Sequence, residues 1–206
     1  QSAGYAASIL RMLGYNNVYD MAFGMSSWNQ ECANSWEPNI SNQYATQFVT
    51  DSYPKADEGE MPELNTGAEE GAAILQARAQ ELLQNGFGQA NISAANVYAD
   101  LEAYYIVNYW PTDHYNWGHI EGAIHYQPNE SLKLANDLKT LPTDETIVVY
   151  CYTGQNSAHI AAYLKMLGYD AKSLLFGVNG MAYNDMPGTK FNPDSHIMGY
   201  DYVTSD

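Results

Sequence analysis

The sequence predicts an α/β fold in which a mostly parallel sheet is covered by helices on both faces. Short apolar segments alternate with segments of helical periodicity between residues 92 and 187. The run 146–151 (TIVVYC) is almost continuously apolar, which is typical of a parallel strand buried on both faces. Because such sheets bind ligands at the carboxyl ends of their strands, the loop after residue 151 is the first candidate site.

The individual elements follow from caps, breakers and periodicity. Ser93 is a natural N-cap for a short helix within 92–102, and Pro111 ends the strand that follows it. A helix at 67–86, which Asn85-Gly86 stops, leads into this region. The remaining expected elements are strands at 104–110, 123–126, 146–151 and 171–176, helical segments at 112–115, 131–141 and 156–167, and turns at 118–122 and 142–144.

Composition narrows the possible partners. The 206 residues carry a formal charge of -16, which disfavours binding to nucleic acid and to acidic membrane surfaces. The sequence contains no run of roughly 18 apolar residues, so it predicts no membrane-spanning helix. The start Gln1-Ser-Ala-Gly is neither a signal peptide nor an initiation site, so we expect the natural N-terminus to lie upstream. Acidity together with 18 tyrosines slightly favours an exported or periplasmic protein over a cytoplasmic one.

The chain also contains an internal match. Residues 1–15 align without a gap on residues 155–169, and Phe23-Gly24 then answers Phe176-Gly177. This pattern predicts a structural repeat whose first copy lacks everything that precedes residue 155 in the second. The predicted helix 2–13 needs a partner for its apolar face: part of the first copy was lost, or the helix packs on the second copy, or it packs on a neighbouring molecule. That face consists of Ala6, Ile9, Leu10 and Leu13.

The two cysteines occur in different settings. Cys32 lies in the polar, proline-containing stretch 31–66, which we interpret as a linker, and Cys151 ends an apolar strand. We interpret them as separate thiols, with Cys32 incidental and a resolving thiol as the alternative. No spacing of His, Asp and Cys predicts a metal site, and the expected chemistry requires no cofactor.

Cys151 stands where a thiol ionises readily. It lies between the end of a strand and the start of a helix, so the helix dipole and the N–H groups of the loop favour the thiolate. Gly154 lets the loop bend around the sulfur, and the same cradle can hold a second sulfur as a persulfide. The alternative is a buried cysteine that only packs.

Residues 92–187 resemble the rhodanese-like sulfurtransferases. The resemblance rests on the Ile92-Ser93 helix start, the turn Gly118-His-Ile-Glu-Gly-Ala123, the strand into Cys151, the six-residue loop Cys-Tyr-Thr-Gly-Gln-Asn, and Leu-Gly-Tyr before a glycine-rich turn. The loop is similar to that of a tandem bacterial subgroup. The resemblance implies a mostly parallel, five-stranded sheet and Cys151 as the sulfur-carrying nucleophile. The implied substrate cradle is the backbone of Tyr152, Thr153, Gly154, Gln155 and Asn156.

The resemblance further implies a domain plan and a reaction. Residues 1–30 are the C-terminal half of a preceding, truncated rhodanese-like domain, 31–66 a linker, 67–187 a complete domain with its leading helix, and 188–206 a tail. The implied enzyme takes sulfane sulfur from thiosulfate, polysulfide or a persulfide, including one on a partner protein, and passes it to cyanide or a thiol. The alternative function is a non-catalytic binding or scaffold module of the same fold.

Two departures from the family bear on the substrate. The strand that usually carries an Asp-x-Arg pair reads Asn108-Tyr-Trp110, and the loop contains no Arg or Lys. Without fixed positive charge, we expect the dianion thiosulfate to be a poorer donor than polysulfide or a persulfide. Phosphatases of this fold have a loop one residue longer that ends in Arg, whereas the first basic side chain after Cys151 is Lys165, which argues against that activity.

Several other residues can be explained by structural roles. His119 is interpreted as a hydrogen-bonding residue of its turn rather than a base, and His159 as a packing residue. The aromatic residues either wall the mouth of the pocket or pack in the core; they are Tyr109, Trp110, Tyr115 and Trp117.

Overall fold

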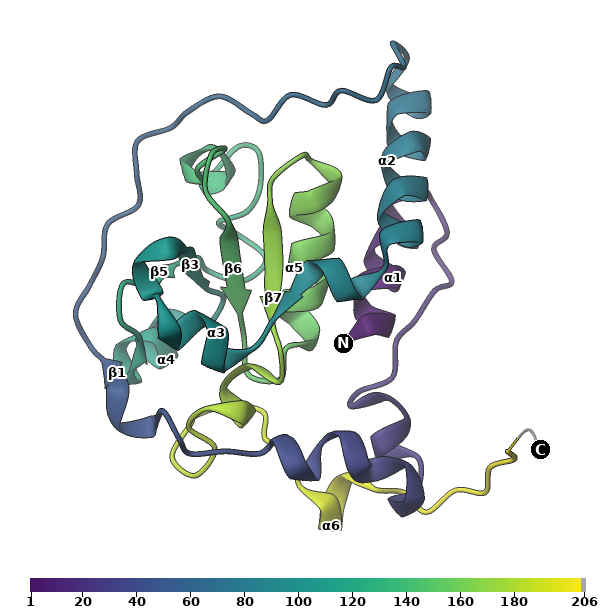
Figure 1. Ribbon diagram of the computed structural model, residues 1–206, viewed down its shortest axis with the longest axis vertical. Coiled ribbons are helices and arrows are strands. Elements are labelled where there is room, and N and C mark those ends of the chain that lie inside the picture. Colours follow the sequence, from purple (N-terminus) through teal and green to yellow (C-terminus); the bar gives the residue numbers. More distant parts are fainter. Residues whose placement is uncertain (205–206) are drawn as a thin grey trace.

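The centre of the molecule is a five-stranded sheet, seen in a computed structural model that describes residues 1–204 (Figure 1). The strand order is β2-β7-β6-β3-β5, and neighbouring strands run parallel. The strands are β2 (Asn91–Ile92), β3 (Tyr105–Asn108), β5 (Ile124–His125), β6 (Ile147–Tyr150) and β7 (Ala171–Leu174). The predicted α/β fold with a parallel sheet is confirmed, and β6, the strand that leads to Cys151, lies in the middle of the sheet.

Helices cover both faces of the sheet. The α-helices of the described residues are α1 (Ser2–Met12), α2 (Gly71–Asn85), α3 (Ala94–Ala99), α4 (Thr112–Trp117), α5 (Gln155–Met166) and α6 (Pro193–His196). Ser93 caps α3 as expected, because its Oγ accepts a hydrogen bond of 3.2 Å from the Asn96 amide. Within the described part of the chain, no helix combines the length and the apolar character needed to cross a bilayer.

Strand side chains alternate between two hydrophobic cores. On one face Ile106, Val148 and Leu174 pack in a cluster with Trp110. On the other face the intervening strand residues pack against α5; this cluster includes Val107, Ile147, Val149 and Ala171 with Ala161 and Leu164 of the helix. Because both faces of β6 are buried, the strand is fixed in position and its carboxyl end provides a rigid base for the residues that follow.

The N-terminal helix α1 packs directly on α5, with α2 beside both (Figure 1). Tyr5 and Ile9 of α1 are at most 2% exposed in a cluster that contains Ala158 and Ala162 of α5. Three partners were considered for the apolar face of α1, and the structure shows that the helix packs on α5, the matching helix of the same chain. Only Ile9 of the predicted apolar face is fully buried, because the small residues of α5 admit Tyr5 instead.

The two matching segments share backbone conformations. Gly14 and Gly168 end their helices with φ of 94° and 98°, and Phe23 and Phe176 both have φ of 60°. The 3₁₀ helices Gly24–Ser27 and Gly177–Gly180 follow these phenylalanines. Equivalent glutamines cross between the segments: Gln1 Oε1 accepts the Phe176 amide at 3.3 Å, and Gln155 Oε1 accepts the Phe23 amide at 3.0 Å.

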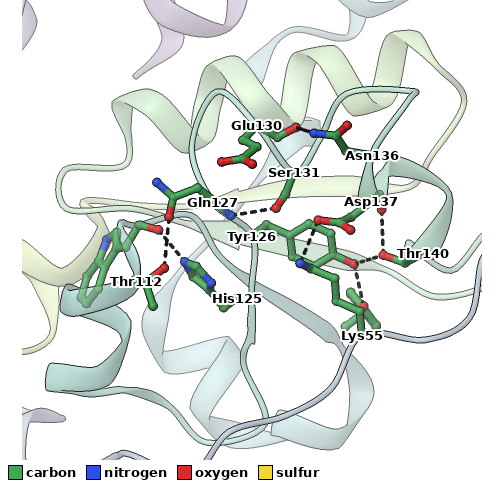
Figure 2. Close-up of polar contacts among 12 residues, drawn as sticks. Lys55, Thr112, His125, Tyr126, Gln127, Glu130, Ser131, Asn136, Asp137 and Thr140 are labelled. Carbon is green, nitrogen blue, oxygen red and sulfur yellow. Dashed lines mark hydrogen bonds and ion pairs between the residues drawn. The ribbon is translucent and has the colours of Figure 1, made fainter.

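The chain between β1 (Phe48–Val49) and α2 runs around the edge of the domain and is attached to it (Figure 1). β1 pairs antiparallel with β4 (His119–Ile120), which lies within the predicted turn 118–122. Further along, the Lys55 ammonium lies 2.9 Å from an Asp137 carboxylate oxygen and 4.9 Å from the centre of the Tyr126 ring (Figure 2). This stretch is therefore fixed to the domain surface at several points.

We expect Lys55→Met to lower the free energy of unfolding by about 0.5–1 kcal/mol near neutral pH, since partly exposed ion pairs contribute little. Burial alone would raise the pKa of Asp137, but hydrogen bonds from Lys55 and Ser131 and the Lys55 charge lower it below its usual 3.8. Because the folded pKa is depressed, the contribution is complete above the usual value and is lost as the pH falls through the folded value.

Urea titrations at about pH 7 and about pH 3 check this dependence, since the gap between wild type and Lys55→Met should shrink at the lower pH. Lys133→Met is the matched control, because Lys133 is exposed and makes no ion pair among the described residues. A gap of equal size at both pH values would contradict the assignment.

The predicted helix at 131–141 is wrong, since only Asp137–Thr140 forms a 3₁₀ helix. Ser131 Oγ accepts the Gln127 amide at 3.1 Å (Figure 2). The Ser131 carbonyl accepts the Asp137 amide at 2.9 Å. Short polar side chains that bond to nearby backbone compete with helical hydrogen bonds. Leu132 and Leu138, which gave the apolar spacing, are both buried, but Leu132 lies in a turn and Leu138 in the 3₁₀ helix.

Residues 188–206 were predicted to be a tail, but the first part of this region packs against the rest of the protein. Phe191 is fully buried between Phe23 and Trp36, with ring centres 5.1 and 5.3 Å apart from them. Residues 205–206, the end of the predicted tail, lie outside the described residues.

Candidate functional site

Cys151 lies at the carboxyl edge of the central strand. It follows β6 directly, the loop 152–154 joins it to α5, and its side chain is 2% exposed. Gly154 has φ of 75°, and a Cβ at this position would lie 2.9 Å from the Leu174 carbonyl oxygen. The turn therefore requires glycine, and it brings the N-terminus of α5 against the sulfur.

Two buried serines connect to the sulfur. The amide of Ser157 donates to Cys151 Sγ at 3.4 Å, and the thiol lies 3.7 Å from the Ser157 hydroxyl oxygen, to which it donates. Ser157 Oγ is 2.8 Å from Ser173 Oγ, and Ser173 donates to the Gly154 carbonyl at 3.2 Å. When the thiol loses its proton, the Ser157 hydroxyl can rotate and donate to the sulfur instead, so the same contact serves both protonation states.

The loop amides are the second feature of the cradle. Thr153 Oγ1 accepts the Gln155 amide at 3.3 Å, which stabilises the turn. Among residues 1–204, the amides of Thr153, Gly154 and Asn156 donate to no protein acceptor. Amides without a protein acceptor beside a helix N-terminus favour an anion or an added sulfur.

The loop rests on the 3₁₀ helix Gly177–Gly180. The Val178 amide donates to the Cys151 carbonyl at 3.1 Å, and the Asn179 side chain donates to the Tyr152 carbonyl at 2.7 Å. Asn179 is fully buried and also accepts the Phe191 amide at 2.8 Å. These bonds attach the Cys151 loop to the 3₁₀ helix Gly177–Gly180 and so fix its position.

Tyr152 forms an aromatic wall with Trp110. Their ring centres lie 5.1 Å apart with planes 17° from parallel, and the Tyr152 hydroxyl bonds to Nδ1 of His114. Burial, more than the nearby Asp113 and Cys151 charges, raises the pKa of Tyr152 to about 12, so the phenol stays protonated. Of the aromatic residues weighed from the sequence, Trp110 is fully buried and supports the wall from the core.

A cavity of about 270 Å³ opens beside the cysteine. It is lined by Asp20, Ala22 and Phe23 from the N-terminal segment, by Cys151, Tyr152, Thr153, Gln155, Asn156 and His159, and by Thr189. Within the described residues, no Lys or Arg contributes to this lining.

Of the residues predicted for the site, Cys151, Tyr152, Thr153, Gln155 and Asn156 line the cavity, but their side chains make different contacts. The Gln155 side chain is bonded to the N-terminal segment, because its Oε1 accepts the Phe23 amide and its Nε2 donates to the Met21 carbonyl at 3.2 Å. Asn156 is exposed at the cavity, and Thr153 is buried in the turn.

Several residues of the site were missed by the sequence analysis. Ser157 follows the predicted loop directly, and a serine at the buried start of a helix was an available signal. Asp20, Ser173 and Thr189 lie far away in the sequence, so nothing local indicated them.

His119 does not line the cavity; it bonds to two backbone carbonyls elsewhere in the fold. It is fully buried, with Nδ1 2.9 Å from the Tyr115 carbonyl and Nε2 2.7 Å from the Asp51 carbonyl. Over the described range, no group of three His, Cys, Asp or Glu side chains is placed to hold a metal ion. Cys32 is partly buried and lines another cavity, with Trp36.

Fold and site together define an α/β domain with a cysteine loop at the carboxyl edge of its central parallel strand. Residues 93–182 match the family described as the rhodanese-like domain. This part of the chain therefore is a rhodanese-like domain, and the predicted resemblance is confirmed for it. The tandem arrangement and the bacterial loop subgroup stay predictions.

Solved structures with similar domains are remote in sequence. One is a rhodanese-related protein from Thermoplasma volcanium (24% identity, 48% of this chain and 95% of that one, TM-score 0.40). Another is a protein from Bacillus halodurans (21% identity, 48% and 74%, TM-score 0.41). A third, an NAD-dependent persulfide reductase from A. fulgidus, matches at 28% identity over 52% of this chain but only 18% of its own, with a TM-score of 0.37. No curated protein matches the chain.

Proposed function

We propose that Cys151 carries sulfane sulfur as a persulfide and passes it to a thiophilic acceptor, a thiol or cyanide. The observation that supports this most is the position of Sγ, which accepts the Ser157 amide at the helix N-terminus and borders a cavity of about 270 Å³. The unpaired amides of the loop suit an added anionic sulfur. The rhodanese-like domain is compatible with sulfur chemistry of this class.

The reaction proceeds by two displacements at sulfur. A singly ionised persulfide R–S–S⁻ takes up the proton of the Cys151 thiol, and the resulting thiolate attacks the outer sulfur of R–S–SH. The S–S bond of the donor breaks, RS⁻ leaves, and the enzyme holds Cys–S–SH. An acceptor thiolate R′S⁻ then attacks the outer sulfur of the enzyme persulfide, giving R′–S–SH and restoring the Cys151 thiolate. Neither step needs an external oxidant or reductant, because sulfane sulfur only changes its bonding partner.

The lining of the cavity bears on the donor. Asp20 is acidic, and no Lys or Arg from the described residues faces the cavity. We therefore expect the persulfide of a small thiol or of a protein to load Cys151 better than thiosulfate, with polysulfide also a candidate.

Intact mass measures this proposal directly. After incubation with polysulfide, and separately with thiosulfate, the protein should gain the mass of one sulfur atom, and mild reductant should remove it. The gain should persist in Cys32→Ser and vanish in Cys151→Ser, which keeps the polar side chain but cannot form a persulfide. A gain that survives in Cys151→Ser would assign the sulfur to another residue and overturn the proposal.

A second function, a non-catalytic binding module, is favoured by one observation. Cys151 is 2% exposed and its thiol already has a hydrogen-bond partner. An inert thiol would react with iodoacetamide no faster than the partly buried Cys32, and it would take up sulfur from neither donor. Faster alkylation of Cys151, identified by peptide mass, would decide for the carrier.

A further inference from the structure

One side of the Cys151 cavity is built by residues 20–23, which lie outside the rhodanese-like domain of residues 93–182. Two side chains of α5 hold this segment in place. Gln155 bonds to the backbone of Met21 and Phe23, and His159 Nε2 lies 3.1 Å from Asp20 Oδ1. Because Gln155 and His159 are four residues apart, they lie on the same face of the helix.

The Asp20–His159 pair is shielded from solvent. The Asp20 side chain is 16% exposed and that of His159 is 25% exposed. The glycine at position 4 makes room for the pair, since a Cβ there would lie 3.1 Å from His159 Nε2 and 3.3 Å from Asp20 Oδ2. A carboxylate in this position is screened less than one on the open surface, so its field reaches a ligand in the cavity.

We propose that Asp20 is a specificity-determining residue, which makes the Cys151 site select against doubly charged sulfur donors and favour the singly charged persulfide of a small thiol. The inference rests on the proposed sulfur transfer and names its substrate class. One unit charge across such a cavity changes the rate for a ligand by about 5-fold per unit of ligand charge. Thiosulfate and a singly ionised persulfide differ by one charge, and so do iodoacetate and iodoacetamide.

Asp20→Asn, prepared in the Cys32→Ser background, removes the charge and keeps the shape. We expect the ratio of the iodoacetate to the iodoacetamide rate at Cys151 to rise about 5-fold at low salt, and to rise less in about 0.5 M salt. The ratio of sulfur loading from thiosulfate to loading from the persulfide of 2-mercaptoethanol should rise by the same factor. Using ratios cancels changes in the ionised fraction of the thiol and in access to it.

Two variants isolate the cause. His159→Gln alters the pair but keeps the carboxylate, so it should leave the discrimination against anions unchanged or strengthen it. Asp144→Asn removes one negative charge from an exposed position that precedes β6, at the other end of the strand from Cys151, and should leave both ratios unchanged. Burial lowers the pKa of the Gln1 amino group, which the Asp20 and Cys151 charges oppose, but this group is common to all the variants.

The alkylation ratio separates this inference from the proposed function. If Cys151 takes up no sulfur but the alkylation ratio rises in Asp20→Asn, the electrostatic role stands and the transferase proposal fails. If both ratios stay at the wild-type value, or if His159→Gln raises them as much as Asp20→Asn does, the assignment of Asp20 is overturned.

Discussion

Gly177→Ala is expected to lower the free energy of unfolding by about 3–5 kcal/mol, combining the cost of a left-handed backbone with overpacking. Gly177 has φ of 52°, and a Cβ there would lie 2.2 Å from the Cys151 carbonyl oxygen and 2.8 Å from the Gly154 amide nitrogen. Neither atom can move without displacing the cysteine loop. Urea titration measures the loss, and the protein that remains folded should load sulfur more slowly.

Gly24→Ala is the matched control, because Gly24 occupies the aligned turn of the N-terminal segment. Its φ is 61°, but a Cβ there meets nothing within 4 Å. We expect a loss of about 1–2 kcal/mol, which is the backbone cost alone. Losses of equal size in the two variants would show that the contact with the cysteine loop is relieved elsewhere, and that the 3₁₀ helix does not fix the loop as described.

Most of the fold could be predicted from local chemistry. The strand into Cys151, the Ser93 cap and the helix after the loop each follow from a few adjacent residues, and the structure contains all three. The prediction of a helix at 131–141 failed because short polar side chains such as Ser131 bond to nearby backbone, and a periodicity argument does not detect this competition.

For the candidate site too, the sequence predicted the features that depend on adjacent residues and missed those that depend on distant ones. The sequence predicted Cys151 and the backbone of its loop, since these are contiguous, but it indicated no role for the Gln155 side chain. In the structure, Gln155 holds residues 21–23, and His159, interpreted as packing, bonds to Asp20, which is 139 residues away. Contacts at such separation depend on how α1 packs on α5, and no local pattern encodes that arrangement.

Ser157→Ala is expected to slow sulfur loading and alkylation of Cys151 by about 10- to 100-fold, the value of a hydrogen bond to a charged group. The Ser157 hydroxyl lies 3.7 Å from Sγ and can donate to the thiolate, whereas the Ser157 amide bond of 3.4 Å survives the substitution. Rates are measured by the mass of the Cys151 peptide over time.

Ser173→Ala removes the next hydroxyl along the same chain, 2.8 Å from Ser157 Oγ, and therefore serves as the control. Both serines are fully buried, so each variant should lose a similar amount of stability, about 1–2 kcal/mol. In Ser173→Ala the Ser157 hydroxyl remains free to donate to sulfur, and the rate should fall no more than about 3-fold, because only the second link of the chain is lost. Equal rates in the two variants would mean that the serines support the packing around Cys151 and not its ionised form.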